Sequence, residues 1–415
     1  MLTGVMLERR GFLAGLAALA ATPAFARDTK AWPEVQALLD RYVAEKKVSG
    51  LSLALTTGGS PLAYVNAGTL ALDSAVAANE DTLWRIYSMT KPITGAAAAL
   101  LIEEGKLKLD QPVSDFFPAY AKITVATDPA KSLDARPAKN PMTVRHLMTH
   151  TSGLTYTITG NGPVNKAYRE QGLFGFLGQP PAPGDGPMPA SLVEFAEKLA
   201  TVPLIAEPGT QHNYSVSLDL LGAVIEKASG MPYAAFLQTR FFDPLGMTST
   251  AFNALDLKRL STNYLVTPKG LLPADTAAKS VYAPPATVAY GGAGLVSSSR
   301  DYARFGLMLL GDGALDGKRV MKAETAQLIR SNLLPAGVTA MDDNSGYGAG
   351  GRVVTPTTKD ANDSVGAYGW GGAAGTSFWI DPARKTMVTL MTQFMPSDAY
   401  PIRKELRDAI IADRA

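Results

Sequence analysis

The sequence contains no cysteine and only three histidines, which are His146, His150 and His212. The absence of cysteine excludes disulfides, zinc–thiolate sites, iron–sulfur clusters and a cysteine nucleophile. His146 and His150 lie four residues apart but lack the glutamate of a His-Glu-x-x-His zinc motif. The glycines of 346–351 fit a dinucleotide-binding pattern but follow a turn rather than a strand. We therefore expect neither a metal nor a cofactor.

An excess of charge of either sign is also missing. The chain has 39 Lys and Arg against 37 Asp and Glu, a net charge of +2 in 415 residues. Without a basic patch or run, nucleic-acid binding is not expected. Hydrophobic residues make up 46% and charged residues 18%, which is typical of a soluble globular protein and excludes disorder. The length predicts two or three structural units.

Residues 1–26 have the composition of an export signal. The Arg9-Arg10 pair precedes the apolar run 11–21, and Ala24-Phe25-Ala26 is a cleavage pattern. The arginine pair resembles a twin-arginine signal. The run is shorter than the ~20 apolar residues of a membrane span, and no later stretch is long enough, so we expect no stable membrane insertion. We predict a periplasmic or secreted protein that begins near Arg27; a cytoplasmic protein with a chance arginine pair is the alternative.

Strand patterns lie near both ends of the chain, and helix patterns dominate the middle. Strands are predicted at 51–56, 61–70, 376–380 and 386–394, and helices at 32–47, 88–104, 191–200, 218–228, 233–242, 299–310, 322–331 and 400–413. Terminal strands most simply join one sheet. We therefore predict an α+β fold, an α/β sandwich whose antiparallel sheet is flanked by helices, beside an all-helical lobe. The sheet domain would comprise 27–87 and 285–415, the helical domain 88–284, with a ligand cleft between them.

The segment 172–189 is crowded with glycine and proline. Proline removes backbone donors and fixes φ, so this segment cannot form a helix or a central strand. Long loops without secondary structure are often functional in compact domains. We favour a loop that covers the cleft over an idle linker.

Ser88 and Lys91 form a Ser-x-x-Lys pair at the beginning of the most apolar predicted helix. Three residues apart on a helix, the hydroxyl and the amine lie on the same face. Serine needs an adjacent base to act as a nucleophile. Burial disfavours a charged amine, so a buried lysine can accept the serine proton. The alternative is a helix cap beside a solvated lysine, because such a pair also arises by chance.

Two further segments contain residue types suited to acyl transfer. Tyr214 stands just before a predicted helix, and a tyrosine can act as general acid and base. Trp370-Gly371-Gly372-Ala373 leads into a predicted strand, where consecutive glycines let a substrate approach the backbone. The N–H that follows them could complete an oxyanion hole. The alternative to a catalytic role is an interfacial tyrosine for Tyr214, and a β-bulge for the consecutive glycines.

These three segments, in this order, resemble the serine β-lactamase and penicillin-binding protein superfamily, in which Ser-x-x-Lys is a known motif. The stretches 146–154, 243–247 and 291–295 resemble it as well. The likeness covers nearly all of the mature chain and is greatest for the class C-like branch, in particular the family VIII carboxylesterases. By this resemblance, the Tyr-x-Asn motif of β-lactamases corresponds to Tyr214-Ser215-x-Ser217-x-Asp219. Their Lys-Thr-Gly motif corresponds to Trp370-Gly371-Gly372.

The resemblance implies a β-lactamase/transpeptidase-like fold and a reaction through an acyl-enzyme. It makes Ser88 the nucleophile, Lys91 its partner and Tyr214 the general base and acid. It assigns the oxyanion hole to the backbone N–H groups of Ser88 and Ala373, and substrate contacts to Trp370, Gly371 and Gly372.

The chain departs from β-lactamases at two of these motifs. Lys-Thr-Gly is absent, and Val216 replaces the asparagine of Tyr-x-Asn. We therefore predict a serine carboxylesterase that acts on small-molecule esters of short to medium acyl groups. A β-lactamase, a D-stereospecific peptidase or amidase, and an acyltransferase are the enzymatic alternatives. An inactive, peptidoglycan-binding relative is the non-enzymatic one, and the sequence does not indicate the oligomeric state.

Overall fold

The computed structural model describes residues 31–175, 182–285, 288–341, 343–359 and 362–414. Within these ranges seven strands form one sheet in the order β11-β12-β13-β14-β15-β1-β2, and each neighbouring pair is antiparallel. The strands are β1 (Gly50–Thr56), β2 (Ala63–Gly68), β11 (Gly346–Tyr347), β12 (Arg352–Val353), β13 (Tyr368–Gly371), β14 (Ser377–Asp381) and β15 (Thr386–Met391). Because β1 pairs with β15, the two ends of the chain share one sheet, as predicted.

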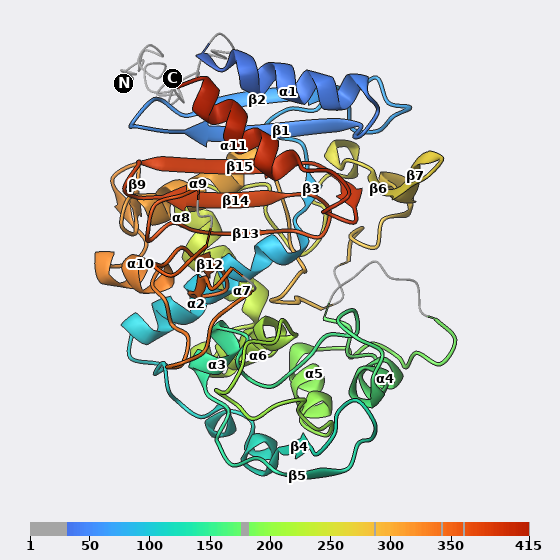
Figure 1. Cartoon of the computed structure of the whole chain (residues 1–415), viewed down its shortest axis with the longest axis vertical. Helices are drawn as coiled ribbons and strands as arrows, with labels where there is room; N and C mark the ends of the chain where they lie inside the picture. The colour runs from blue at the N-terminus through green and yellow to red at the C-terminus, as the bar shows by residue number, and fades with distance from the viewer. Residues whose placement is uncertain (1–30, 176–181, 286–287, 342, 360–361, 415) are drawn as a thin grey trace, which may run out of the picture.

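Helices cover both faces of this sheet (Figure 1). On one face, α1 (Pro33–Ala44) and α11 (Ile402–Ala412) pack on side chains such as Trp379 and Val388. On the other face, α9 (Ser299–Leu310) packs on the alternate residues of the same strands, such as Phe378 and Met387. Alternation of side chains along a strand separates the two apolar layers. The predicted sheet flanked by helices is confirmed.

The remaining helices lie mostly below the sheet in the view of Figure 1. They are α2 (Thr90–Glu103), α3 (Val144–Met148), α4 (Pro163–Glu170), α5 (Leu192–Leu199), α6 (Ser217–Ser229), α7 (Tyr233–Leu237), α8 (Asp243–Leu245) and α10 (Ala323–Ile329). Short strands pair outside the main sheet: β3 (Trp84–Arg85) with β8 (Val296–Ser297), β4 (Thr124–Ala126) with β5 (Ala135–Pro137), β9 (Ala314–Leu315) with β10 (Lys318–Arg319), and β6 (Asn263–Thr267) with β7 (Gly270–Asp275) and β16 (Phe394–Met395).

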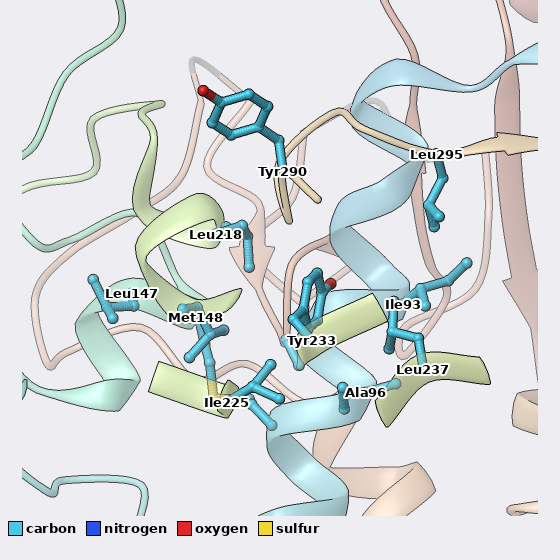
Figure 2. Close-up of a cluster of buried hydrophobic side chains, with 14 of the residues drawn as sticks. Ile93, Ala96, Leu147, Met148, Leu218, Ile225, Tyr233, Leu237, Tyr290 and Leu295 are labelled. Atoms are coloured by element: carbon cyan, nitrogen blue, oxygen red, sulfur yellow. The ribbon is translucent and has the colours of Figure 1, made fainter. Parts of the chain in front are cut away.

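The helix α2 is buried between the sheet and the helical lobe. All its residues from Thr90 to Leu101 are buried, as the even distribution of apolar residues predicts. Figure 2 shows Ile93 and Ala96 of this helix among side chains of other elements, including Ile225 of α6. At Gly95 an added Cβ would lie 2.2 Å from the Ala349 carbonyl oxygen, so the glycine permits close contact with that backbone. The helix α2 is therefore packed closely against its surroundings along this part of its length.

Several predictions concern other parts of the chain. The export signal at 1–26 lies outside the described residues and stays a prediction. The predicted domain boundary between residues 284 and 285 also stays a prediction. Strand pairing crosses this boundary, because β6 before it pairs with β16 after it. The described parts of the Gly/Pro-rich segment, 172–175 and 182–189, contain no helix or strand. None of the helices in the described ranges has the length and apolar character needed to cross a bilayer.

Candidate active site

A cavity of about 480 Å³ lies where the start of α2 meets strand β13. Its lining includes six residues that the sequence predicts for the site: Ser88, Tyr214, Trp370, Gly371, Gly372 and Ala373. This volume is in the range of small-molecule sites in proteins. The fold thus brings together residues from three distant parts of the chain. The described residues of the Gly/Pro-rich segment 172–189 do not line this cavity.

Ser88 lies in a 3-10 turn, η2 (Tyr87–Met89), that leads directly into α2. Tyr87, the residue before it, has φ +43°, a left-handed conformation that is uncommon for a residue with a side chain. Such strained backbone persists where the surroundings enforce it, and it clusters at functional sites. Here the Tyr87 side chain is buried and its hydroxyl accepts a hydrogen bond from the Asn263 side chain at 3.2 Å. Buried contacts thus hold the turn in place.

Lys91 is fully buried beneath Ser88, as the predicted spacing requires. Its Nζ donates to the Ser88 Oγ at 3.2 Å, to the Tyr156 hydroxyl at 3.1 Å and to the Gly292 carbonyl oxygen at 2.8 Å. Three acceptors thus surround the Lys91 amine at hydrogen-bond distance. The lysine is therefore a buried partner of the serine and not a solvated side chain beside a helix cap.

The Tyr214 hydroxyl lies on the other side of Ser88. It donates to the Ser88 Oγ at 2.7 Å, and it accepts the indole N–H of Trp370 at 3.4 Å. The Lys91 Nζ lies 4.6 Å from the centre of the Tyr214 ring. This geometry allows Tyr214 to exchange a proton with Ser88.

Asp219 lies behind Lys91, in the first turn of α6, and is fully buried. Its Oδ1 accepts the Gly292 N–H at 2.7 Å, so the residue that accepts from Lys91 also donates to Asp219. Burial raises the pKa of Asp219 to about 7, although Lys91 opposes the shift. An added Cβ at Gly292 would lie 2.5 Å from Asp219 Oδ2 and 2.8 Å from the Tyr156 hydroxyl, so only glycine fits there.

The turn after β13 lies against the segment that contains Ser88. The Gly372 N–H donates to the Thr376 carbonyl oxygen at 2.9 Å. An added Cβ at Gly372 would lie 2.4 Å from the Ile86 carbonyl oxygen, two residues before Ser88. No acceptor among the described residues takes the Ala373 N–H, and Ala373 lines the cavity with Ser88. The Ala373 N–H is therefore available to a ligand atom.

Two of the three histidines, His146 and His150, have structural contacts. The Nδ1 of His146 accepts the Thr143 N–H at 3.2 Å and so caps α3. His150 is fully buried, its Nδ1 accepts the Ser215 N–H at 3.2 Å, and its ring centre lies 4.7 Å from that of Tyr214. Burial lowers the pKa of His150 well below its usual range, so the ring is neutral. Among the described residues, no cluster of three or more metal-ligating side chains occurs.

Two side chains near the reacting groups were not predicted as site residues. The Tyr156 hydroxyl accepts a hydrogen bond from Lys91. In the sequence Tyr156 follows the stretch 146–154 and belongs to no motif that would indicate contact with Lys91. Arg403 lines the cavity from α11, whose sequence reads as an ordinary amphipathic helix. Neither position could be found without the tertiary structure.

Comparison with known proteins places this arrangement in a family. The model of the family described as Beta-lactamase matches residues 35–413. The Protein Rv1367c of Mycobacterium tuberculosis (strain ATCC 25618 / H37Rv) is 34% identical over 345 residues, covering 78% of this chain and 80% of that protein. The Esterase EstB of Burkholderia gladioli is 29% identical over 406 residues, covering 91% and 94%. The solved structure of "EstCE1, a hydrolase with promiscuous acyltransferase activity" has a TM-score of 0.75 at 24% identity, covering 91% and 97%.

Proposed function

The chain belongs to the Beta-lactamase family and is a serine hydrolase, and we propose that it cleaves carboxylic esters through an acyl-enzyme on Ser88. The observation that supports this best is the position of the Ser88 Oγ. It lies within hydrogen-bond distance of both Lys91 Nζ and the Tyr214 hydroxyl, at the wall of a cavity large enough for a small molecule. A nucleophile beside its base is the arrangement that covalent acyl transfer requires.

In the acylation step, the Ser88 Oγ attacks the ester carbonyl carbon, and its proton passes to the pair formed by Lys91 and Tyr214. The carbonyl oxygen becomes an oxyanion, which accepts the Ala373 N–H and the N–H of Ser88 itself. The tetrahedral intermediate collapses when the bond to the alcohol oxygen breaks, and Tyr214 returns the proton to that oxygen. The alcohol leaves, and the acyl group remains on Ser88.

In the deacylation step, the same groups work in the reverse order. Tyr214 takes a proton from water, the resulting hydroxide attacks the acyl carbon, and Ser88 recovers its proton as the acid leaves. An alcohol can replace water, which converts hydrolysis into acyl transfer. The name of EstCE1 records both activities in one protein of this fold. We propose hydrolysis as the main reaction and acyl transfer to an alcohol as the second.

The cavity wall supports esters of apolar acids. The lining includes the Trp370 indole, whose N–H donates to the Tyr214 hydroxyl beside Ser88, together with Ile158 and Met341. Three arginines, Arg352, Arg403 and Arg407, lie on the lining as well. An indole packs well against acyl chains and aromatic alcohols, but it cannot neutralise a carboxylate. EstB is named an esterase, which agrees with this choice of substrate. We propose neutral esters with short to medium acyl groups.

A substrate panel tests this function. Esters of graded acyl length, a cephalosporin and a D-alanyl peptide are compared under one set of conditions, with Ser88→Ala as the blank. We expect neutral esters to have the highest kcat/KM, and intact-mass analysis to find one acyl adduct on the peptide that contains Ser88. An adduct on another serine, or a cephalosporin turned over as well as the best ester, would refute the proposal.

We propose export by the twin-arginine-like signal, which rests on the sequence of residues 1–26 alone. Arg9→Lys/Arg10→Lys should leave a full-length precursor in the cytoplasm, whereas the wild-type product should begin near Arg27. Export that is unaffected by the double change would contradict the assignment.

A further inference from the structure

Arg403 reaches from the first turn of α11 to the turn that follows β13. Its Nη2 donates to the Gly372 carbonyl oxygen at 3.1 Å and to the Thr376 carbonyl oxygen at 2.9 Å. These two carbonyls stand at the two ends of the turn, so one guanidinium bridges it. The Gly372 N–H also donates to the Thr376 oxygen, which closes the turn from inside.

The sequence leaves room for this guanidinium. An added Cβ at Gly371 would lie 2.6 Å from Arg403 Nη2 and 2.8 Å from its Cζ. Side chains alternate along a strand. Trp370 therefore projects to the opposite face, where its ring lies 5.6 Å from that of Tyr214. The glycine at 371 thus has a specific purpose beyond substrate access, because any side chain there would displace the arginine.

The bonded carbonyl and the predicted oxyanion donor belong to the same peptide unit. The peptide bond between Gly372 and Ala373 is planar and trans, so the Gly372 C=O and the Ala373 N–H point in opposite directions. A donor that fixes the carbonyl therefore also fixes the direction of the N–H. A charged donor forms a stronger hydrogen bond than a neutral one. Hydrogen bonds in a chain polarise one another, so this contact makes the N–H a better donor.

Arg403 forms no ion pair within the described part of the chain, and its Nε has no hydrogen-bond partner. Asp398 and Arg407 act on its charge in opposite directions. Burial, and after it the nearby charge of Arg407, lowers the pKa of Arg403, whose side chain is half-buried at the cavity wall. By contrast, the neighbouring Lys404 is exposed and pairs with Asp408 at 2.8 Å. The hydrogen-bond acceptors of the Arg403 guanidinium are therefore the two carbonyl oxygens of the turn, those of Gly372 and Thr376.

We propose that Arg403 is a positioning residue, which orients and polarises the Gly372–Ala373 peptide so that the Ala373 N–H stabilises the oxyanion. This inference rests on the proposed function, because it needs an acyl transfer at Ser88. It assigns a role in the reaction to α11, the last helix of the chain, which contacts no reacting atom.

Arg403→Met tests the inference by kinetics. Removing an oxyanion-hole donor outright costs about 10²–10³ in kcat, and a weakened donor costs less. We expect kcat to fall by about 10–100-fold with KM changed less than about threefold, since the donor acts on the transition state. Arg403→Lys, which can reach one carbonyl but not bridge both, should retain an intermediate kcat. Lys404→Met removes a cation from the same helical turn and should leave both constants unchanged.

A spectroscopic measurement separates this role from a structural one. Hydrogen bonding to the acyl carbonyl lowers its stretching frequency, so infrared spectra of the isotope-labelled acyl-enzyme report the strength of the oxyanion hole. We expect the frequency to rise in Arg403→Met and to rise less in Arg403→Lys. An unchanged frequency in both variants, with the acyl group on Ser88, would overturn the inference and leave the proposed function intact. If the wild type forms no acyl-enzyme on Ser88, the proposed function itself fails.

Discussion

The two sides of Ser88 differ in what the protein provides there. On the helical side, the groups are side chains that can hold or donate a proton: Lys91, Tyr156, Tyr214 and Asp219. On the strand side, β13 and its turn provide mainly backbone, with glycine at 371 and 372. A proton transfer needs particular residue types, whereas stabilisation of an oxyanion needs an N–H in the right place. The comparison therefore separates chemistry set by residue identity from chemistry set by backbone shape.

The two sides also differ in how their glycines are constrained. On the helical side, Gly292 is surrounded by Asp219 and Tyr156, so the missing side chain allows a polar cluster to close. On the strand side, Gly372 faces the Ile86 carbonyl oxygen and Gly371 faces a guanidinium. In both places a methyl group would push apart the groups that the reaction needs. The glycines at these positions are thus required as strictly as the residues that react, because no side chain fits there.

The largest effect is expected on the helical side. Ser88→Ala removes the nucleophile and should lower kcat by at least ~10³-fold. Lys91→Met and Tyr214→Phe should come close to this loss. The double variant Lys91→Met/Tyr214→Phe should lose little more activity than either of its single variants, because the effects of residues that act as a unit do not add. Steady-state kinetics on the best ester, with thermal unfolding to check the fold, provides the measurement. Losses that multiply in the double variant would show that the two residues act independently.

On the strand side, Gly372→Ala should have the next largest effect. The added Cβ meets the Ile86 carbonyl oxygen at 2.4 Å and the Thr376 Oγ1 at 2.2 Å, so the turn must move away from Ser88. Loss of an oxyanion donor corresponds to about 10²–10³ in kcat, and we expect a decrease of that order. Gly366→Ala is the control: it adds the same methyl group at a strained position, φ +88°, where the Cβ meets no atom within 4 Å and this turn is not displaced. If the two variants lose activity equally, a general loss of stability and not the oxyanion hole explains the effect.

This contrast also explains what could be predicted from the sequence. A continuous apolar run predicted α2, and helical or strand patterns predicted α6 and the terminal strands, because burial leaves such patterns in a sequence. Ser88, Lys91 and Tyr214 were recognisable since each belongs to a short motif. Arg403 was not, because it reaches the turn only when α11 packs on the sheet, and that contact joins residues about 30 positions apart without any pattern. Backbone contributions leave glycines in the sequence but do not say what occupies the space beside them.

The charge on the helical side can be tested through pH. Burial raises the pKa of Asp219 to about 7, above the ~3.9 of an unfolded aspartate. Between these values the folded protein binds more protons than the unfolded chain, so the free energy of unfolding falls as pH rises from about 4 to 7. Asp219→Asn cannot titrate, so relative to the wild type it should gain about 2–4 kcal/mol across this range. Chemical denaturation at several pH values measures this, and an identical pH dependence in both proteins would contradict it.

The smallest effect is expected for Trp370, a large side chain of the strand side that lines the cavity with Ser88. Its indole N–H donates to the Tyr214 hydroxyl, and its ring forms the wall where an acyl group would pack. Trp370→Lys replaces that apolar wall with a cation, and an opposite charge near a bound carboxylate favours it by about 1 kcal/mol at a solvated site. We therefore expect the preference for neutral esters over a cephalosporin to shrink by about tenfold in kcat/KM. Part of the change comes from slower ester turnover, since Tyr214 loses a donor.

Trp370→Phe separates these two contributions. It removes the N–H but keeps an apolar ring, so it should slow esters and cephalosporins to the same degree and leave their ratio unchanged. If Trp370→Phe changes the ratio as much as Trp370→Lys does, the indole acts through Tyr214 and not by excluding charge. The strand side would then contribute to proton transfer as well, and the separation between the two sides of Ser88 would no longer hold.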